Sequence, residues 1–214
     1  MKKKLTVVFF MLYAVLPAAF SQKAISDGTL TYNIAIQSQG GAASSALLTI
    51  YLKGLVSRTD MSSNLGSEKT IHDAKSGTTA ILKEYSGQKL MITLTKENWQ
   101  EKNKKSEGVV FTAQAEKKEI LNYGCTKAAA KLNDGSVLTV FYTSDLIVQN
   151  KEYDPLFKNL DGLPLKYEVD NGKMKFTYTI EKIDQVAVPQ AKFDLPKAGY
   201  RVITYDENKL GNKQ

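Results

Sequence analysis

Few side chains in the 214-residue sequence could act as nucleophiles, bases or metal ligands. His72 is the only histidine, which excludes a metal site built on two histidines. A Ser-His-Asp triad could use only this residue as its base. Carboxylates such as Asp134 and Asp145 could flank a glycosidic bond, although a turn explains Asp134 better. No Gly-x-Ser-x-Gly elbow and no phosphate-binding glycine loop is present. We therefore predict no catalytic activity, metal or cofactor, and keep carboxylate-based hydrolysis as an alternative.

Three single side chains have a functional and a structural interpretation. Cys125 is the only cysteine, so it is either buried and inert or paired with another chain, and its apolar neighbours favour burial. Trp99 lies in the polar stretch 96–108, which we expect to be a frayed helix or a surface loop. Its indole either packs on the end of a sheet or contacts a ligand, and we favour packing. We expect His72 to be a packed or solvated side chain.

The first 21 residues have the pattern of a cleavable signal peptide. Three lysines at positions 2–4 precede the apolar run 5–15, which is too short for a membrane span. Ala19 and Ser21 supply the small residues that a signal peptidase recognises, so we predict cleavage after Ser21. No later apolar run is long enough to cross a bilayer. We expect a periplasmic protein, with release outside the cell as the alternative.

The charge of the chain does not indicate a nucleic-acid partner. The formal net charge is +7, and removing the three lysines of the leader, which holds no acids, leaves +4. The remaining lysines are spread over loops and edges instead of forming a dense basic patch with interleaved aromatic residues.

Short alternating segments dominate the rest of the chain. In residues 28–37, 46–52, 89–95 and 173–182, apolar side chains occupy every second position, which is typical of strands with one buried face. Turns that contain glycine separate these segments at intervals of about ten residues. This pattern predicts one mainly β domain over residues 22–214, a sandwich or barrel, with a polar tail from about residue 206.

Two hairpins are predicted from their turn residues. Asp134-Gly135 joins the apolar arms of residues 120–144, and Asn171-Gly172 joins residues 163–169 to 173–182. Because the first hairpin lies near the middle of the sequence, we expect it to lie in the middle of one antiparallel sheet.

Residues 154–160 are the strongest helix candidate. Asp154 can cap the first turn, Pro155 suits the first helical position and Gly162 can end the helix. So short a helix needs an apolar surface beneath it, and the concave side of the sheet could supply that surface. Since one short helix cannot fill a large concave face, either the sheet closes on itself with a packed core or an apolar cavity remains.

Four short motifs resemble a known group of exported proteins. They are Ile120-x-x-Tyr123-Gly124-Cys125-Thr126-Lys127-Ala128, Val140-Phe141-Tyr142-Thr143, Leu160-Asp161-Gly162-Leu163-Pro164-Leu165-Lys166-Tyr167 and Phe193-Asp194-Leu195-Pro196-Lys197-x-Gly199-Tyr200. This pattern is similar to that of the GLPGLI group of Gram-negative bacteria, which is related in architecture to the LolA/LolB lipoprotein carriers. The chain departs from the pattern at Phe141, where Trp is frequent, and in the order Tyr123-Gly124, which is usually reversed.

The resemblance implies a fold and a function. The expected fold is a single antiparallel sheet curved into an unclosed β-barrel with a short helical lid, and the expected function is periplasmic binding or carrying of a lipid or acyl chain. The candidate cavity lining is Tyr32, Ile34, Ile50, Leu52, Ile92, Leu94, Val140, Phe157, Leu160, Phe176 and Tyr178. The alternative is an envelope protein-interaction module with a packed core and no ligand.

Overall fold

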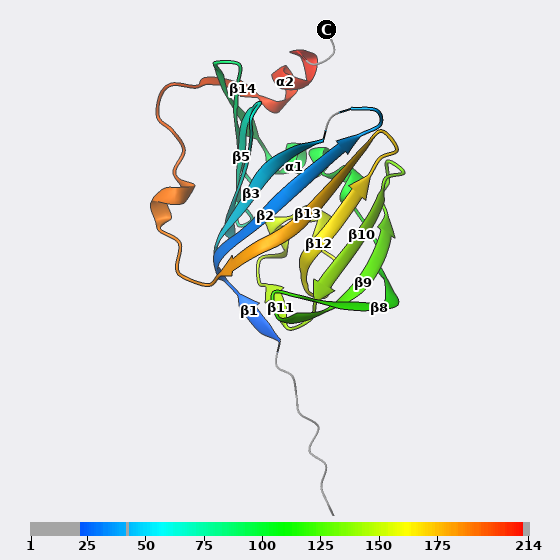
Figure 1. Ribbon diagram of the computed structural model, residues 1–214. Helices are drawn as coiled ribbons and strands as arrows, with labels where there is room; N and C mark the ends of the chain where they lie inside the picture. Colours follow the sequence, from blue (N-terminus) through cyan, green and yellow to red (C-terminus); the bar gives the residue numbers. More distant parts are fainter. Residues whose placement is uncertain (1–21, 42, 212–214) are drawn as a thin grey trace, which may run out of the picture.

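The computed structural model describes residues 22–41 and 43–211. The predicted signal peptide and its cleavage after Ser21 lie outside the described residues. A twelve-stranded sheet forms most of the domain, in the order β14-β7-β6-β5-β4-β3-β2-β13-β12-β10-β9-β8 (Figure 1). Its strands are β2 (Asp27–Ser38), β3 (Ser44–Lys53), β4 (Val56–Ser63), β5 (Gly66–Asp73), β6 (Thr79–Tyr85), β7 (Gln88–Leu94), β8 (Thr112–Ile120), β9 (Tyr123–Lys131), β10 (Val137–Thr143), β12 (Leu163–Asp170), β13 (Met174–Asp184) and β14 (Arg201–Thr204).

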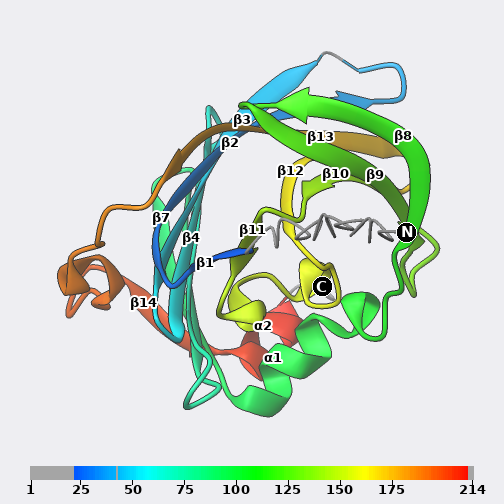
Figure 2. The same cartoon turned by 90° about the horizontal axis from the view of Figure 1, so that it is seen from below.

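The sheet curves strongly without closing. Figure 2 shows it wrapped around an interior, with β8 and β14 at its two ends. The helices α1 (Lys96–Lys102) and α2 (Tyr205–Gly211) lie on the open side between these ends. The predicted fold class, a mainly β domain with a curved and unclosed sheet, is confirmed.

Two strand pairs depart from the antiparallel arrangement. β14 pairs in parallel with β7, and the short strands β1 (Lys23–Ile25) and β11 (Leu146–Val148) form a separate parallel pair. β14 can run parallel to β7 because a long connection, residues 185–200, brings it around the outside of the sheet (Figure 1).

The hairpin around Asp134-Gly135 forms as predicted, and its position in the sheet was predicted wrongly. β9 and β10 pair across the turn, where Gly135 has a φ of 88°. They lie near the end of the sheet, next to β8, and the middle belongs to β3, β2 and β13. The reason is that β2–β7 lie side by side in chain order and form one half of the sheet. The other half consists of β8–β10, β12 and β13, and its strand β13 pairs with β2, so β9 and β10 lie far from the middle.

The predicted helix over residues 154–160 is wrong in type. The chain instead forms two single turns of 3₁₀-helix, η2 (Lys151–Tyr153) and η3 (Pro155–Phe157). Asn150 caps η2, and Asp154 caps η3 by accepting a 3.0 Å hydrogen bond from the backbone N–H of Leu156. The backbone N–H groups of Phe157 and Leu160 donate to the carbonyls three residues earlier, those of Asp154 and Phe157, at 3.1 and 3.0 Å, so these turns close as 3₁₀-helix instead of α-helix.

The real α-helices lie where the sequence appeared most polar. Thr95 and Asn98 form a capping box that starts α1, and η1 (Lys104–Ser106) follows α1 after Asn103. α2 begins at Tyr205 and includes residues 206–211 of the predicted polar tail. At the start of α2, Thr204 and Glu207 exchange the same pair of bonds, so local capping starts both helices, although neither has a buried side chain.

Most of the core lies on the concave face. Alternate residues of β2 and β3, such as Leu30, Tyr32, Ile50 and Leu52, pack there against Phe157 and Leu160. A smaller cluster of Ile81, Ile92 and Leu94 packs with Trp99 of α1 and with residues of the β14–α2 segment.

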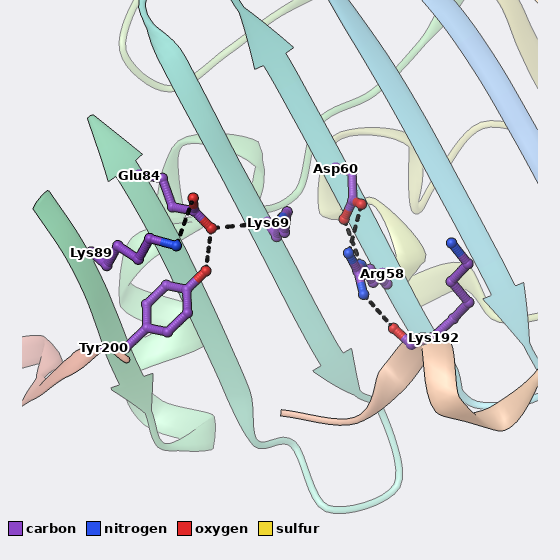
Figure 3. A network of polar contacts seen from close by, with 7 residues as sticks. All are labelled: Arg58, Asp60, Lys69, Glu84, Lys89, Lys192 and Tyr200. Atoms are coloured by element: carbon purple, nitrogen blue, oxygen red, sulfur yellow. Dashed lines mark hydrogen bonds and ion pairs between the residues drawn. The ribbon is translucent and has the colours of Figure 1, made fainter. Parts of the chain in front are cut away.

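The connection 185–200, which we call the strap, covers part of the convex face. It contains η4 (Gln190–Phe193), and its Val188 and Phe193 pack against Ile71 and Leu82 of the sheet. Figure 3 shows its polar anchors. Arg58 binds both carboxylate oxygens of Asp60, at 2.6 and 2.7 Å, and donates a 2.6 Å hydrogen bond to the carbonyl of Lys192.

Candidate functional site

Most of the predicted cavity-lining residues lie in packed clusters. Nine of the eleven are at most 3% exposed, and Phe176 and Tyr178 are half-buried. Ile92 and Leu94 belong to the small cluster under α1, apart from the main concave core. Ile50, Leu52, Val140, Phe157 and Leu160 pack within the main core.

Three of the predicted residues line an apolar pocket of about 110 Å³ on the concave face. We call it the concave pocket. Its lining consists of Ile34, Ile36, Ala46, Met61, Ser63, Gly66, Tyr85, Phe176 and Tyr178.

The register of the strands explains the pocket. One row of directly paired residues crosses six strands in the order Tyr178, Ile34, Ala46, Ser63, Gly66 and Tyr85. Three small residues lie side by side in this row, and a tyrosine stands at each end. The pocket is the space above Ala46, Ser63 and Gly66 that larger side chains would fill.

Gly66 is required at its position. It has a φ of 149°, and a Cβ there would lie 2.2 Å from the carbonyl oxygen of Glu84. The strands are therefore packed too closely at this point for any larger residue.

An aromatic cluster continues from the pocket into the core. The rings of Tyr167 and Tyr178 stack with centroids 4.2 Å apart, and Phe157 meets Tyr167 edge-on at 4.7 Å. Tyr32 also meets Tyr167 edge-on, and its hydroxyl donates a 2.8 Å hydrogen bond to the carbonyl of Pro164. These contacts fix the inner wall of the pocket, since aromatic pairs prefer such geometries.

A carboxyl group lies beside this cluster. Burial raises the pKa of Asp154 to about 6, although the residue keeps part of its surface exposed. Burial, with the nearby charge of Asp154, raises the pKa of Tyr178 to about 12 and raises the pKa values of Tyr32 and Tyr167 in the same way. The sequence indicated only the capping role of Asp154, because no local pattern shows which aromatic rings surround it.

The concave face is more polar on β5 and β6. Glu68 and Lys83 form a 3.2 Å ion pair, and Glu68 is paired in the sheet with Met61 of the pocket. The apolar pocket therefore borders a charged pair that is only partly exposed.

The single side chains considered in the sequence have structural roles. His72 is buried, its Nδ1 lies 2.9 Å from the Thr79 hydroxyl, and its ring stacks on Trp99 at 4.8 Å. Burial lowers the pKa of His72 and raises that of the Cys125 thiol, which favours the neutral form of each. Asp134 accepts a 3.0 Å hydrogen bond from the N–H of Ser136 within its turn.

Two further observations concern the described ranges, residues 22–41 and 43–211. No three His, Cys, Asp or Glu side chains gather there closely enough to hold a metal ion. No helix in the same ranges has both the length and the apolar character needed to cross a membrane.

Comparison with solved structures shows the fold. The chain is similar to part of PNGF-II, solved in space groups C2 and P2₁, with TM-scores of 0.50 and 0.51 and sequence identities of 15% and 14%. The match covers 86% of this chain in both cases, and this chain spans about a third of PNGF-II, 32% and 33%. At such identities the likeness concerns architecture alone.

More distant similar structures include a LolA superfamily protein from Nitrosomonas europaea and MucB. Their TM-scores are 0.39 and 0.43, with 9% and 8% identity. The match covers 81% of this chain in both cases, 92% of the LolA superfamily protein and 58% of MucB. These scores are too low to define a function. No protein-family model and no curated protein matches the chain, so membership of the GLPGLI group stays a prediction.

Proposed function

We propose that the protein is a binding protein of the bacterial envelope without catalytic activity, and that it holds the apolar end of a lipid or acyl chain in the concave pocket. The observation that supports this most directly is the row of Ala46, Ser63 and Gly66 between Tyr178 and Tyr85. It leaves apolar space on a face that is otherwise packed.

The size of the pocket limits what enters it. About 110 Å³ is below the roughly 300–1,000 Å³ of pockets that enclose a whole small molecule. The pocket therefore takes one apolar group, and the rest of the ligand extends along the half-buried side chains of Ile36, Met61 and Phe176. The Glu68–Lys83 pair next to Met61 offers hydrogen-bonding partners to a polar head group.

The proposed location depends on the leader. A basic start, a short apolar run and the Ala19-Phe20-Ser21 site support export to the periplasm. A lipid carrier would find its ligand in that compartment.

Titration of residues 22–214 with a fluorescent fatty acid tests the proposal. Phe176→Lys places a charge at the pocket and is expected to abolish saturable binding. Thr177→Lys, the matched control on the opposite face of β13 beside Glu168, is expected to bind like the wild type. Equal binding by the two variants, or no binding by the wild type, would contradict the proposal.

A second candidate function is an interaction module for another envelope protein. The observation that favours it is β8, an end strand whose residues 112–119 are all exposed. Such an edge can add a strand from a partner, and the concave pocket is large enough for one apolar side chain of that partner. Native mass spectrometry of the protein purified from its envelope compartment distinguishes the two, because a lipid carrier releases an acyl species and an interaction module releases a second polypeptide.

A further inference from the structure

A second and larger recess lies away from the concave pocket. It has a volume of about 670 Å³ and runs between α1–η1 on one side and η2–η3 on the other. We call it the lid cleft. Its lining consists of Trp99, Gln100, Glu101, Asn103, Lys104, Ser106, Glu107, Gly108, Glu152, Pro155, Lys158 and Asn159. Its volume falls within the range that encloses a small molecule.

Side-chain amides fix the walls of the lid cleft. The amide nitrogen of Asn103 donates a 2.8 Å hydrogen bond to the carbonyl of Trp99, and that of Asn159 donates a 2.9 Å bond to the carbonyl of Val109. Asn133, from the β9–β10 turn, donates 3.0 Å bonds to the carbonyls of Lys104 and Glu107. These bonds tie η1 to the β9–β10 turn and join the residues after η3 to the segment after η1, so the cleft is formed before a ligand arrives.

Trp99 gives the lid cleft an apolar surface. The indole is half-buried and stacks on His72, while part of it lines the cleft. Because His72 and the cluster of Ile81, Ile92 and Leu94 hold the indole, it is a fixed apolar group next to the polar groups of the cleft.

The charges in the lid cleft compensate one another. Glu152 forms a 2.5 Å ion pair with Lys158 across the lining, and Glu101 pairs with Lys209 of α2. The remaining lining charges are Glu107 and Lys104, which have opposite signs. A strongly anionic or cationic ligand would therefore find no excess of countercharge.

The polar groups of the lid cleft point to a ligand class. The side chains of Gln100, Lys104, Ser106 and Glu107, which make none of the bonds described above, supply both donors and acceptors beside Trp99. Saccharides are neutral, carry hydroxyl groups that donate and accept, and have an apolar ring face that fits an indole. We infer that the lid cleft is a binding site for a neutral saccharide. This inference is independent of the concave pocket and of its ligand.

The sequence makes the test specific, because Trp99 is the only tryptophan. Residues 22–214 are titrated with maltohexaose, cellohexaose and chitohexaose while the intrinsic fluorescence is recorded. We expect a saturable change of emission with at least one of the three sugars. Backbone amide shifts in a ¹⁵N NMR spectrum should then move for residues 99–108 and 152–159.

Two variants distinguish a site from a nonspecific effect. Gln100→Ala removes an exposed amide from the cleft and should weaken binding at least tenfold, whereas Gln114→Ala on β8 should leave it unchanged. No response to any of the sugars at 10 mM, or equal weakening by both variants, would overturn the inference. The fatty-acid titration with Phe176→Lys reports separately on the concave pocket, so either proposal can fail alone.

Discussion

A Cβ at Gly66 would lie 2.6 Å from Cδ1 of Tyr85, so the absence of a side chain at position 66 lets Tyr85 close one end of the concave pocket. Gly66→Ala should therefore destabilise the protein by about 1–3 kcal/mol, since it combines a steric clash with an unfavourable φ. Urea unfolding followed by circular dichroism measures this change. Gly124→Ala is the control, because its Cβ meets no atom within 4 Å, and equal effects of the two variants would contradict the explanation.

Filling the pocket should reduce binding without unfolding the protein. Ser63→Leu directs an apolar side chain into the space above the small residues, and we expect at least tenfold weaker binding of a fluorescent fatty acid. The neighbouring Ser62→Leu points to the opposite, convex face and should bind normally. Unchanged affinity of Ser63→Leu would show that the ligand does not enter this pocket.

The carboxyl of Asp154 should lower stability at neutral pH. Its pKa rises from 3.8 to about 6 on folding, so the folded state holds the proton more tightly than the unfolded state. The stabilising contribution is complete below about pH 4 and is lost as the pH rises through 6. Asp154→Asn keeps the capping oxygen and should stabilise the protein by about 1–3 kcal/mol at pH 7.5.

Unfolding of Asp154→Asn at pH 4 provides the internal comparison, because the stabilisation should largely disappear there. Asp194→Asn, at an exposed position in the strap, should show no such dependence on pH. A constant difference between Asp154→Asn and the wild type across this range would exclude a buried charge as the cause.

His72 should show the opposite dependence. Burial lowers its pKa below 6.5, so the unfolded state binds the proton more readily. The contribution of His72 to stability is then complete above 6.5 and is lost as the pH falls toward the lowered folded pKa. As the only histidine, it gives one imidazole signal by NMR, and a midpoint at or above 6.5 would refute the prediction.

Arg58 should hold the strap to the convex face. Arg58→Lys cannot make the paired hydrogen bonds to Asp60 together with the bond to the Lys192 carbonyl, and we expect a loss of about 1 kcal/mol. Hydrogen exchange should accelerate in residues 188–194 and remain slow in β2 and β3. Arg201→Lys, at an exposed position on β14, is the matched control. Unchanged exchange in the strap would assign its attachment to Val188 and Phe193 alone.

Local patterns predicted the strands and turns well. The alternation of buried and exposed residues in 28–37, a strand over most of 173–182, and the turns at Gly135 and Gly172 all appear in the structure. Each depends on residues close together in the chain, where side-chain period and backbone preference act directly.

The order of the strands and the concave pocket could not be predicted in this way. The row through Ala46, Ser63 and Gly66 exists only because four hairpins and the β2–β13 pair bring those positions into register. Likewise, the lid cleft joins α1–η1 to η2–η3, which are far apart in the sequence. The concave pocket depends on the exact register of these strand pairs, and the lid cleft on contacts between distant segments; composition and periodicity specify neither.

The pairing of β2 with β13 also determines when the protein can fold. Residues 27–38 are among the first of the domain to leave the ribosome, and their partner strand ends at Asp184. Until that strand emerges, β2 pairs with β3 on one side and has an unpaired edge on the other. The outer edge of β7 stays unpaired for longer, until β14 has been made. The sheet therefore cannot be completed until residues 201–204 have been made, and strand pairs so far apart in the sequence should make folding slow. Until then the consecutive strands β2–β7 can pair only with one another, and the free edges of β2 and β7 favour aggregation.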